Sequence, residues 1–345
     1  MVRRISPRHL FFVVLLLITG LLVPLPFVLV EPGTPDDTFG KIKGKQVLEV
    51  VGRKSFPTTG KLNLTSIWVT NPDSRLHSFE LIRAWADGER SVQPREVFYP
   101  KGIDPNDVKK ENVADMKNSQ LSSTLAAATY LNIPYSERLV VKGATDNSPN
   151  KEAVKKEDEI ISFNGKRITS SNQLRELIRT TTEKNVELQV IRDGKELTIP
   201  VQIRTVQSNG VKKNVIGILI SEDYELPFNV KIRLKNIGGP SAGLILTLAI
   251  IDKLTPGALT QGKVIAGTGT IDPDGNVGDI GGIQQKLIGA RDAGAVLFLA
   301  PQGNCDEVIG HIPDGLTVAA VRTLDQAMAA IETFNSGGQV NSCLK

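Results

Sequence analysis

Histidine and cysteine are both scarce in this chain of 345 residues. The three histidines, His9, His77 and His311, are widely separated, and there are only two cysteines. No zinc motif can be written with these residues, because such motifs need several closely spaced cysteine and histidine ligands. Lone histidines are more often structural than catalytic. We therefore predict no metal site, and structural roles for His77 and His311.

Nucleotide-binding motifs and a strong excess of charge are also missing. The chain has no Gly-x4-Gly-Lys-Ser/Thr motif, which argues against the phosphate-binding loop that many ATPases use. The formal net charge is only +4, which gives no reason to expect binding to nucleic acid. What remains is an ordinary globular composition, 40% hydrophobic and 23% charged, with enough residues for about two domains.

The N-terminal residues predict a membrane anchor. Arginines precede an apolar run from Leu10 to Val30. A helix of that length would span about 31 Å, close to the ~30 Å thickness of a bilayer core. The positive-inside rule then places the arginines in the cytoplasm and everything after Glu31 outside. A cleaved signal peptide is the alternative, although no small-x-small cleavage site follows the run.

The two cysteines, Cys305 and Cys343, both lie near the C-terminus, on the side that is expected to be outside the cytoplasm. Disulfides form and persist in such compartments. We expect a Cys305–Cys343 disulfide that ties down the C-terminal tail. Two free thiols are the alternative.

Hydrophobic patterning divides the rest of the chain into three parts. Residues 37–130 predict strands followed by helices, and residues 131–208 predict a mostly β unit with one helix after Ser171. Residues 209–345 alternate the two kinds of element. Strands are expected there at 215–220, 229–234, 264–270, 296–300 and 317–321, and helices at 241–254, 282–293, 306–309 and 324–333.

The part from 131 to 208 resembles a bacterial PDZ domain. The resemblance rests on Asp158-Glu-Ile-Ile-Ser-Phe-Asn-Gly-Lys166 and Val190-Ile-Arg-Asp-Gly194. It departs at Glu157, where a glycine is usual. PDZ domains bind the C-terminal carboxylate of a peptide in a hydrophobic-Gly-hydrophobic loop, and the matching stretch is Leu131-Asn132-Ile133, with Asn132 in the glycine position. A domain that docks within the protein or acts as a lid is the alternative.

A serine and a lysine carry the strongest chemical signal. Gly-Pro-Ser-Ala-Gly at residues 239–243 places Ser241 at a turn that opens an apolar helix, and Lys286 begins a second helix. A serine hydroxyl needs a base to take its proton, and lysine can be that base only if burial lowers its pKa from ~10.4. The alternatives are a capping serine after a helix-starting proline and a solvated lysine.

Together these motifs resemble the Ser–Lys dyad of the Lon peptidase family. The segment from Thr268 to Lys286 is similar to the one that brings in the Lon catalytic lysine. The resemblance implies that Ser241 is the nucleophile, Lys286 the general base and Thr268 a residue that orients the lysine amine. Gly239 would leave room for a substrate carbonyl beside the oxyanion site. The lead-in Ile237-Gly238 differs from the usual Lys-Asp.

The whole layout is similar to that of the membrane-anchored PDZ–Lon serine proteases of Gram-positive bacteria. The resemblance implies an α/β (α+β) Lon-type peptidase domain with an inserted, mostly β PDZ domain and one N-terminal transmembrane helix. The expected boundaries are 1–36 for the cytoplasmic tip, anchor and linker, 37–130 for a segment of the peptidase domain, 131–208 for the PDZ domain and 209–345 for the proteolytic domain.

The function implied is that of an ATP-independent serine endopeptidase without a cofactor. It would cut flexible or unfolded extracytoplasmic protein segments, which the PDZ domain selects or gates. Lon peptidase domains form six-membered rings, so a homo-oligomer is expected by resemblance. A non-catalytic PDZ/Lon-like scaffold at the membrane is one alternative. A signal-peptidase-like enzyme is another, but its serine would lie next to the membrane segment.

Overall fold

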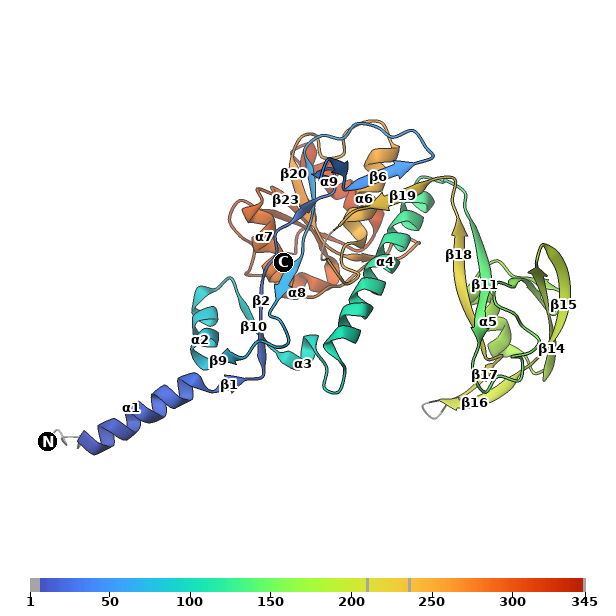
Figure 1. Ribbon diagram of the computed structural model, residues 1–345. Helices are drawn as coiled ribbons and strands as arrows, with labels where there is room; N and C mark the ends of the chain where they lie inside the picture. The colour runs from blue at the N-terminus through green and yellow to red at the C-terminus, as the bar shows by residue number, and fades with distance from the viewer. Residues whose placement is uncertain (1–6, 209–210, 235–236, 344–345) are drawn as a thin grey trace. The chain divides into compact units, whose positions relative to one another are not determined.

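The computed structural model describes residues 7–208, 211–234 and 237–343 (Figure 1). Contacts divide the chain into two compact units. Unit 1 comprises Met1–Ile133 and Phe228–Lys345, and unit 2 comprises Pro134–Pro227. In sequence, unit 2 is therefore an insertion into unit 1.

Unit 1 contains most of the helices. They are α1 (Pro7–Leu22), α2 (Ser78–Asp87), α3 (Arg95–Phe98), α4 (Pro105–Tyr130), α6 (Gly243–Leu254), α7 (Ile283–Asp292), α8 (Cys305–Val308) and α9 (Leu324–Asn335), with a 3₁₀ turn at Gln302–Asn304. Its strands are β1 (Pro24–Leu25), β2 (Phe27–Pro32), β3 (Asp36–Asp37), β4 (Lys41–Ile42), β5 (Lys45–Gln46), β6 (Leu48–Val51), β7 (Lys61–Leu64), β8 (Ile67–Val69), β9 (Leu76–His77), β10 (Ser91–Pro94), β19 (Asn229–Ile232), β20 (Val264–Gly267), β21 (Thr270–Ile271), β22 (Val277–Gly278), β23 (Leu297–Pro301) and β24 (Thr317–Val321).

The main sheet of unit 1 joins segments from both halves of the sequence. Its strand order is β24-β23-β20-β7-β3, and all neighbouring pairs are parallel except β7 with β3. Strand β6 also pairs with β19. Residues 37–130 therefore supply strands to the same fold that the last third of the chain builds.

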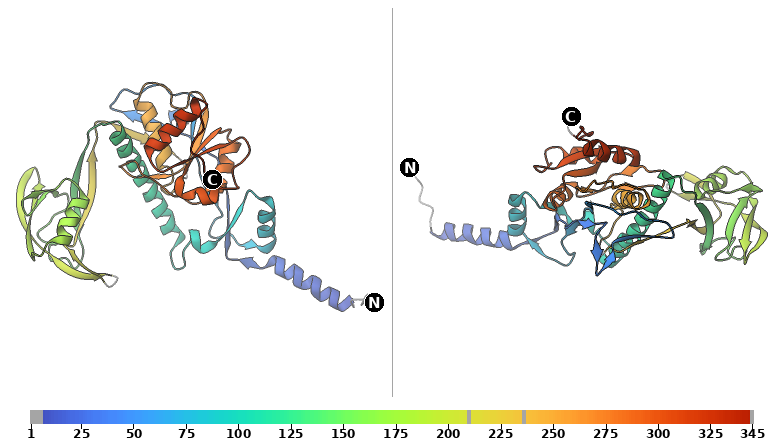
Figure 2. Two further views of the ribbon diagram at one scale, coloured as in Figure 1. Left: turned by 180° about the vertical axis from the view of Figure 1, so that it is seen from behind. Right: turned by 90° about the horizontal axis from the view of Figure 1, so that it is seen from above.

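Helices cover both faces of this sheet. On one face, Ala266, Phe298 and Ala300 pack in a buried cluster with Ile283 and Leu287 of α7. On the other face α6 approaches so closely that a Cβ atom on Gly267 would lie 2.9 Å from Ile245 Cδ1. Helix α4 lies alongside α6 (Figures 1 and 2). Almost all of α6 is buried, which fits its mostly apolar sequence.

The prediction of one membrane-spanning helix from Leu10 to Val30 is wrong in its second half. Helix α1 ends at Leu22, and β1 and β2 follow. Strand β2 lies between β8 and β10, and Val28, Leu29 and Val30 are buried. Prolines at 24 and 26 interrupt helical hydrogen bonding, and β-branched residues favour the strand. No helix within the described ranges is long and apolar enough to cross a membrane. Residues 1–6 lie outside those ranges.

The linker expected before residue 37 also has regular structure. It includes the end of β2 and the start of β3. Thr38 is fully buried, and its backbone N–H and its hydroxyl both donate to Leu62 O. This segment therefore contributes β3 to an edge of the main sheet.

Unit 2 is an antiparallel sheet with one helix. Its elements are β11 (Ser136–Ala144), β12 (Glu159–Phe163), β13 (Lys166–Arg167), α5 (Ser171–Thr180), β14 (Asn185–Arg192), β15 (Lys195–Gln202), β16 (Arg204–Ser208), β17 (Val211–Val215) and β18 (Ile218–Glu225). The strand order is β15-β14-β12-β11-β18. Leu174 and Ile178 of α5 pack into the same apolar core as the strands.

Unit 2 extends beyond residue 208, where the PDZ domain was expected to end, as far as Pro227. Strand β18 pairs with β11 along its whole length, from Ser136↔Glu225 to Ala144↔Ile218. The single strand expected at 215–220 is instead divided between β17 and β18, because Gly217 adopts a positive φ of 66° between them. Non-local pairing with β11, which the local pattern does not reveal, assigns this segment to unit 2.

The unusual loop at Glu157 keeps a glycine-like backbone. Glu157 has φ 71°, a conformation that costs a non-glycine residue roughly 1–2 kcal/mol. The next residue, Asp158, is fully buried and accepts hydrogen bonds from Arg192 Nε and Nη2 at 2.6 Å each. This buried ion pair joins the loop to β14 and holds the strained turn in place.

Candidate active site

The turn that carries Ser241 is fixed from several sides. Gly239 has φ 80°, which glycine adopts at little cost. Gly269 donates its N–H to Ser241 O at 2.9 Å, and Leu244 donates to Gly269 O at 3.0 Å. A Cβ atom on Gly243 would lie only 2.9 Å from Ile271 N. The glycines of the motif therefore permit a tight strand-to-helix approach, and Ser241 stands at its apex.

Helix α4 holds the same turn through three hydrogen bonds. Gly239 donates its N–H to Asn112 O at 2.9 Å. The hydroxyl of Ser119 donates to Pro240 O at 2.9 Å, and that of Ser123 donates to Gly243 O at 3.0 Å. The sequence analysis missed these α4 residues. Their one signal was a set of serines on the otherwise alanine-rich, buried half of a helix.

Lys286 is a buried amine with no ion-pair partner among the residues that the structure describes. Its side chain lies in α7 with an exposed fraction of 3%, and its Nζ donates to Thr268 Oγ1 at 3.1 Å. Thr268 Oγ1 in turn donates to Ser241 O at 3.1 Å. Burial lowers the pKa of Lys286 to about 7, because the charged amine loses its hydration. A neutral amine, which can accept a proton, is thus available near neutral pH.

Ser241 and Lys286 line one cavity of about 590 Å³. No direct hydrogen bond joins Ser241 Oγ to Lys286 Nζ in the described structure; Thr268 Oγ1 instead joins Lys286 Nζ to the backbone carbonyl oxygen of Ser241. Catalytic hydrogen bonds are often long or poorly aligned before substrate binds. The other lining residues include polar, acidic and apolar side chains: Thr34, Asp36, Ser66, Ile67, Trp68, Phe98, Asn112, Ile237, Asp279 and Ile280.

Some backbone N–H groups of the serine turn already form a hydrogen bond within the fold, whereas others have no acceptor there. The N–H of Gly239 is already bound to Asn112 O, and Pro240 has none. The N–H groups of Ser241 and Ala242 donate to no acceptor among the described residues. They lie at the start of α6, where unpaired N–H groups can stabilise developing negative charge. Gly239 thus supplies space rather than a hydrogen-bond donor.

The stretch predicted as a peptide-binding loop lies elsewhere in the fold. Leu131 is the C-cap of α4, and Asn132 takes φ 52°. All three residues, Leu131-Asn132-Ile133, group with unit 1 and not with the antiparallel sheet of unit 2. The hydrophobic-Gly-hydrophobic pattern also occurs at Ile216-Gly217-Ile218, directly before the edge strand β18. That second match was present in the sequence and overlooked.

The loop at 216–218 has the features of a carboxylate site. The backbone N–H groups of Ile216 and Gly217 donate to no acceptor among the described residues. Ile216 O is held by Asn150 Nδ2 at 2.7 Å, which fixes the loop from below. Ser171, the first residue of α5, donates its hydroxyl to Glu222 of β18. Helix α5 and the edge strand β18 are therefore neighbours, as in a groove that accepts an added strand.

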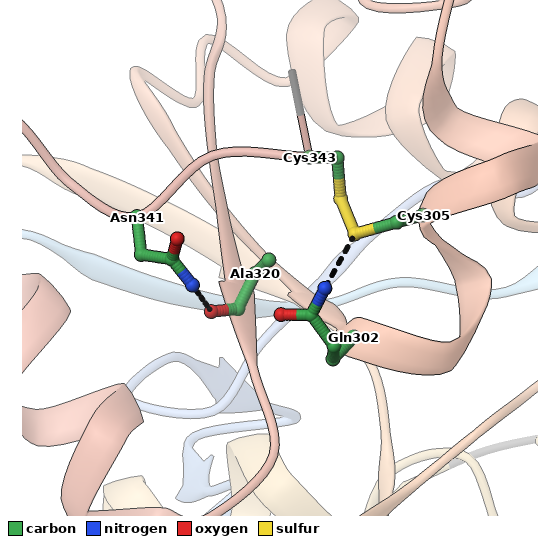
Figure 3. The surroundings of a disulfide bond; sticks show 5 residues. All are labelled: Gln302, Cys305, Ala320, Asn341 and Cys343. Atoms are coloured by element: carbon green, nitrogen blue, oxygen red, sulfur yellow. Dashed lines mark hydrogen bonds between the residues drawn. A yellow bond between two sulfur atoms is a disulfide. The ribbon is translucent and has the colours of Figure 1, made fainter. Parts of the chain in front are cut away.

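The two cysteines form a disulfide with a Cα–Cα distance of 5.0 Å (Figure 3). It attaches the C-terminal tail beside β24, where Ala320 N donates to Asn341 O at 2.8 Å and Asn341 Nδ2 donates to Ala320 O at 3.2 Å. Both cysteines are part of the buried cluster between α7 and the sheet. The disulfide therefore supports the face of the sheet that is covered by α7, the helix that carries Lys286.

Metal ligands are not gathered anywhere in the described ranges. No group of three or more His, Cys, Asp or Glu side chains there could hold an ion. The arrangement can instead support acyl transfer, since it combines a hydroxyl, a buried amine and free backbone N–H groups around one cavity.

Comparison with known families assigns both units. The Lon protease (S16) C-terminal proteolytic domain matches residues 235–332, a range that includes Ser241, Thr268 and Lys286. A PDZ domain matches residues 98–203. The chain carries a Lon-type proteolytic domain and a PDZ domain. The PDZ match begins within α3 of unit 1 and ends before β18, so it does not reach the loop at 216–218.

Relatives with similar sequence are Lon proteases. Lon protease of Geobacter metallireducens is 35% identical over 100 residues, which cover 28% of this chain and 12% of that protein. Lon protease 1 of Bacillus subtilis is 32% identical over 93 residues, with 26% and 12% covered. Lon protease 2 of Herpetosiphon aurantiacus is 37% identical over 93 residues, with 26% and 11% covered. The chain thus spans about an eighth of the length of these relatives.

A solved PDZ domain of an SdrC-like protein from Listeria monocytogenes also matches. It is 18% identical and covers 24% of this chain and 85% of the solved chain, with a TM-score of 0.22. A likeness this weak carries no argument about unit 2, whose description rests on its own strand pairing.

Proposed function

We propose that this protein is an ATP-independent serine endopeptidase that acts through a Ser241–Lys286 dyad. The observation that carries the proposal is the burial of Lys286, which lowers its pKa to about 7 beside a serine turn that shares its cavity. A solvated lysine would stay protonated at neutral pH and could not act as a base. The Lon-type proteolytic match over the same residues adds support.

The mechanism that follows is acyl transfer in two steps. Lys286 Nζ takes the proton of Ser241 Oγ as the oxygen attacks the carbonyl carbon of the scissile bond. The carbonyl π electrons move to the oxygen, and when they return the C–N bond breaks and the leaving amine takes the proton from Lys286. Water then repeats the sequence on the acyl-enzyme and releases the second product. Thr268 Oγ1 keeps the amine in position throughout.

Its substrates would be flexible or unfolded protein segments. The chain has no phosphate-binding loop for an ATPase, and the proposal contains no step that unfolds a substrate. The PDZ domain would select or gate these segments. Their C-terminal carboxylates would bind the free N–H groups of Ile216 and Gly217, and their backbone would pair with the free edge of β18.

The proposal includes a membrane location with most of the chain outside the cytoplasm. It is supported by the arginines before the apolar helix α1 and by the exposure of Phe11, Phe12 and Leu15 on that helix. Fractionation of cells that express the full chain tests this location, since a protein that stays in the supernatant after ultracentrifugation contradicts it. Assembly into a six-membered ring is proposed by resemblance alone, and sedimentation velocity measures it.

The first experiment is an assay on the full chain in detergent. A fragment that begins after residue 37 would lose β2 and β3, which belong to the fold. Unfolded casein is incubated without ATP with the wild type and with Ser241→Ala and Lys286→Ala, and released peptides are quantified. We expect release by the wild type and loss in both folded variants. An inert wild type that also resists a fluorophosphonate probe would favour the scaffold alternative.

A further inference from the structure

Two backbone N–H groups are free at the oxyanion site of the proposed peptidase. Serine peptidases stabilise the charged oxygen of the tetrahedral intermediate with preorganised donors aimed at its position. Here the N–H of Gly239 is bound to Asn112 O at 2.9 Å, and Pro240 has no N–H. The start of α6 is left with the N–H groups of Ser241 and Ala242. A side chain over the turn could add a further donor.

Asn112 has the only side-chain amide among the residues that line the catalytic cavity within the described ranges. Its Oδ1 lies 3.9 Å from the position that a Cβ atom on Gly239 would occupy, so the amide group lies over the serine turn. No hydrogen bond engages this amide within the described part of the chain. Since the oxygen and nitrogen of an asparagine are assigned by their partners, a free amide can present its N–H₂ to the cavity.

The position of Asn112 is fixed by its backbone rather than by its side chain. Asn112 O accepts from Gly239, and two further bonds from Ser119 and Ser123 join α4 to the same turn. The side chain is exposed and takes no part in these three hydrogen bonds between α4 and the serine turn. The amide can therefore be removed without loss of the three hydrogen bonds that join α4 to the serine turn.

We infer that Asn112 is a catalytic residue whose side-chain amide donates a hydrogen bond to the oxyanion. The inference rests on the proposed peptidase function. When Ser241 Oγ bonds to the carbonyl carbon and its proton moves to Lys286, the negative charge collects on the former carbonyl oxygen. Ser241 N–H donates to this oxygen from one side and Asn112 Nδ2 from the other. The charge exists only in the intermediate and its transition states, so the bond raises kcat with little effect on KM.

The test compares three variants of the full chain with the wild type. Asn112→Ala removes the amide, and Asn112→Asp keeps its shape but replaces the donor with an acceptor. Asn118→Ala is the matched control, because Asn118 is exposed on the same helix but does not line the cavity. We expect kcat to fall on the order of 100-fold in both Asn112 variants, with KM and the melting temperature nearly unchanged. Asn118→Ala should match the wild type.

A second readout separates oxyanion binding from a general loss of fit. A peptide aldehyde forms a tetrahedral adduct with Ser241, whereas the matching alcohol binds without a covalent bond. Asn112→Ala should weaken inhibition by the aldehyde at least 10-fold and leave that by the alcohol unchanged. If inhibition of Asn112→Ala by the aldehyde and by the alcohol weakens equally, or if its kcat stays within threefold of the wild type, Asn112 is not an oxyanion donor. If the wild type itself shows no Ser241-dependent hydrolysis, the proposed function fails first, and this role fails with it.

Discussion

At the scale of single residues, burial decides the chemistry of this site. The sequence places apolar neighbours around Lys286, but only the packing of α7 against the sheet leaves its side chain 3% exposed. Desolvation then lowers its pKa to about 7. Thr268, fully buried, gives the amine a hydrogen-bond acceptor where no carboxylate forms an ion pair with it. The result is a base that works without histidine.

The pH dependence of hydrolysis follows from this pKa. Below it the amine is protonated and cannot take the proton of Ser241; above it the neutral form dominates. We expect kcat/KM to rise about tenfold per pH unit up to about pH 7 and then to level off. A peptide assay from pH 5 to 10 measures the profile. A rate that does not change with pH, or a midpoint near 10, would contradict the assignment of Lys286 as the base.

Thr268 is predicted to act by positioning the amine. Thr268→Val keeps the volume but removes the hydroxyl that accepts from Lys286 Nζ, so we expect kcat to fall about 10- to 100-fold with a smaller change in KM. Thr268→Ser keeps the hydroxyl and should recover most of the rate. If the valine and serine variants lose activity equally, the methyl group matters and the hydrogen bond does not.

At the scale of elements, local pattern and final structure agree well for three helices of unit 1. Helices α6, α7 and α9 lie close to their predicted ranges, because apolar composition and the turn residues before a helix are local signals. The N-terminal run shows the limit of this reasoning. Apolar composition indicates that residues 10–30 avoid water, but pairing of β2 with β8 and β10 decides that part of the run enters a sheet.

The loop before β18 supplies a test at this scale. Gly217→Ala adds a Cβ atom 2.7 Å from Ser148 Oγ, which should displace the loop and weaken binding of a peptide with a free carboxylate about 10-fold or more. Gly194→Ala is the control, because Gly194 has a similar φ of 75° with no atom within 4 Å of the added Cβ. Fluorescence anisotropy with labelled peptides measures both variants. Equal affinity of the wild type for free and amidated peptides would contradict a carboxylate site.

At the scale of the whole molecule, two units with separate cores share one chain. Helix α4 ends at Tyr130, just before unit 2 begins at Pro134, and β19 begins directly after unit 2 ends at Pro227. Both connections therefore lead into elements of unit 1. Helix α4 is also the helix that forms hydrogen bonds with the turn of Ser241. The order of elements in the sequence does not reveal this role of α4, because its hydrogen bonds with the serine turn join residues more than a hundred positions apart.

The disulfide should stabilise unit 1 alone. It closes a loop of 38 residues, for which chain entropy predicts a loss of up to about 4 kcal/mol in the free energy of unfolding when both cysteines become serine. Urea unfolding measures this loss. Both tryptophans, Trp68 and Trp85, lie in unit 1, so their fluorescence follows that unit. An unchanged fluorescence midpoint in Cys305→Ser/Cys343→Ser would show that the tail does not contribute to the stability of the unit.

The sequence by itself determined what depends on local chemistry. The resemblance of the segments around Ser241, Thr268 and Lys286 to Lon peptidases led to the prediction of a Ser–Lys peptidase, and alternation and turn residues indicated most helices and strands. The tertiary structure alone decided what depends on contacts between distant segments. These are the strand β2 in place of a longer helix, the assignment of β18 to unit 2, the loop at 216–218, and the position of Asn112 over the serine turn. Long-range hydrogen bonds and burial fix these features, and no short window of sequence contains them.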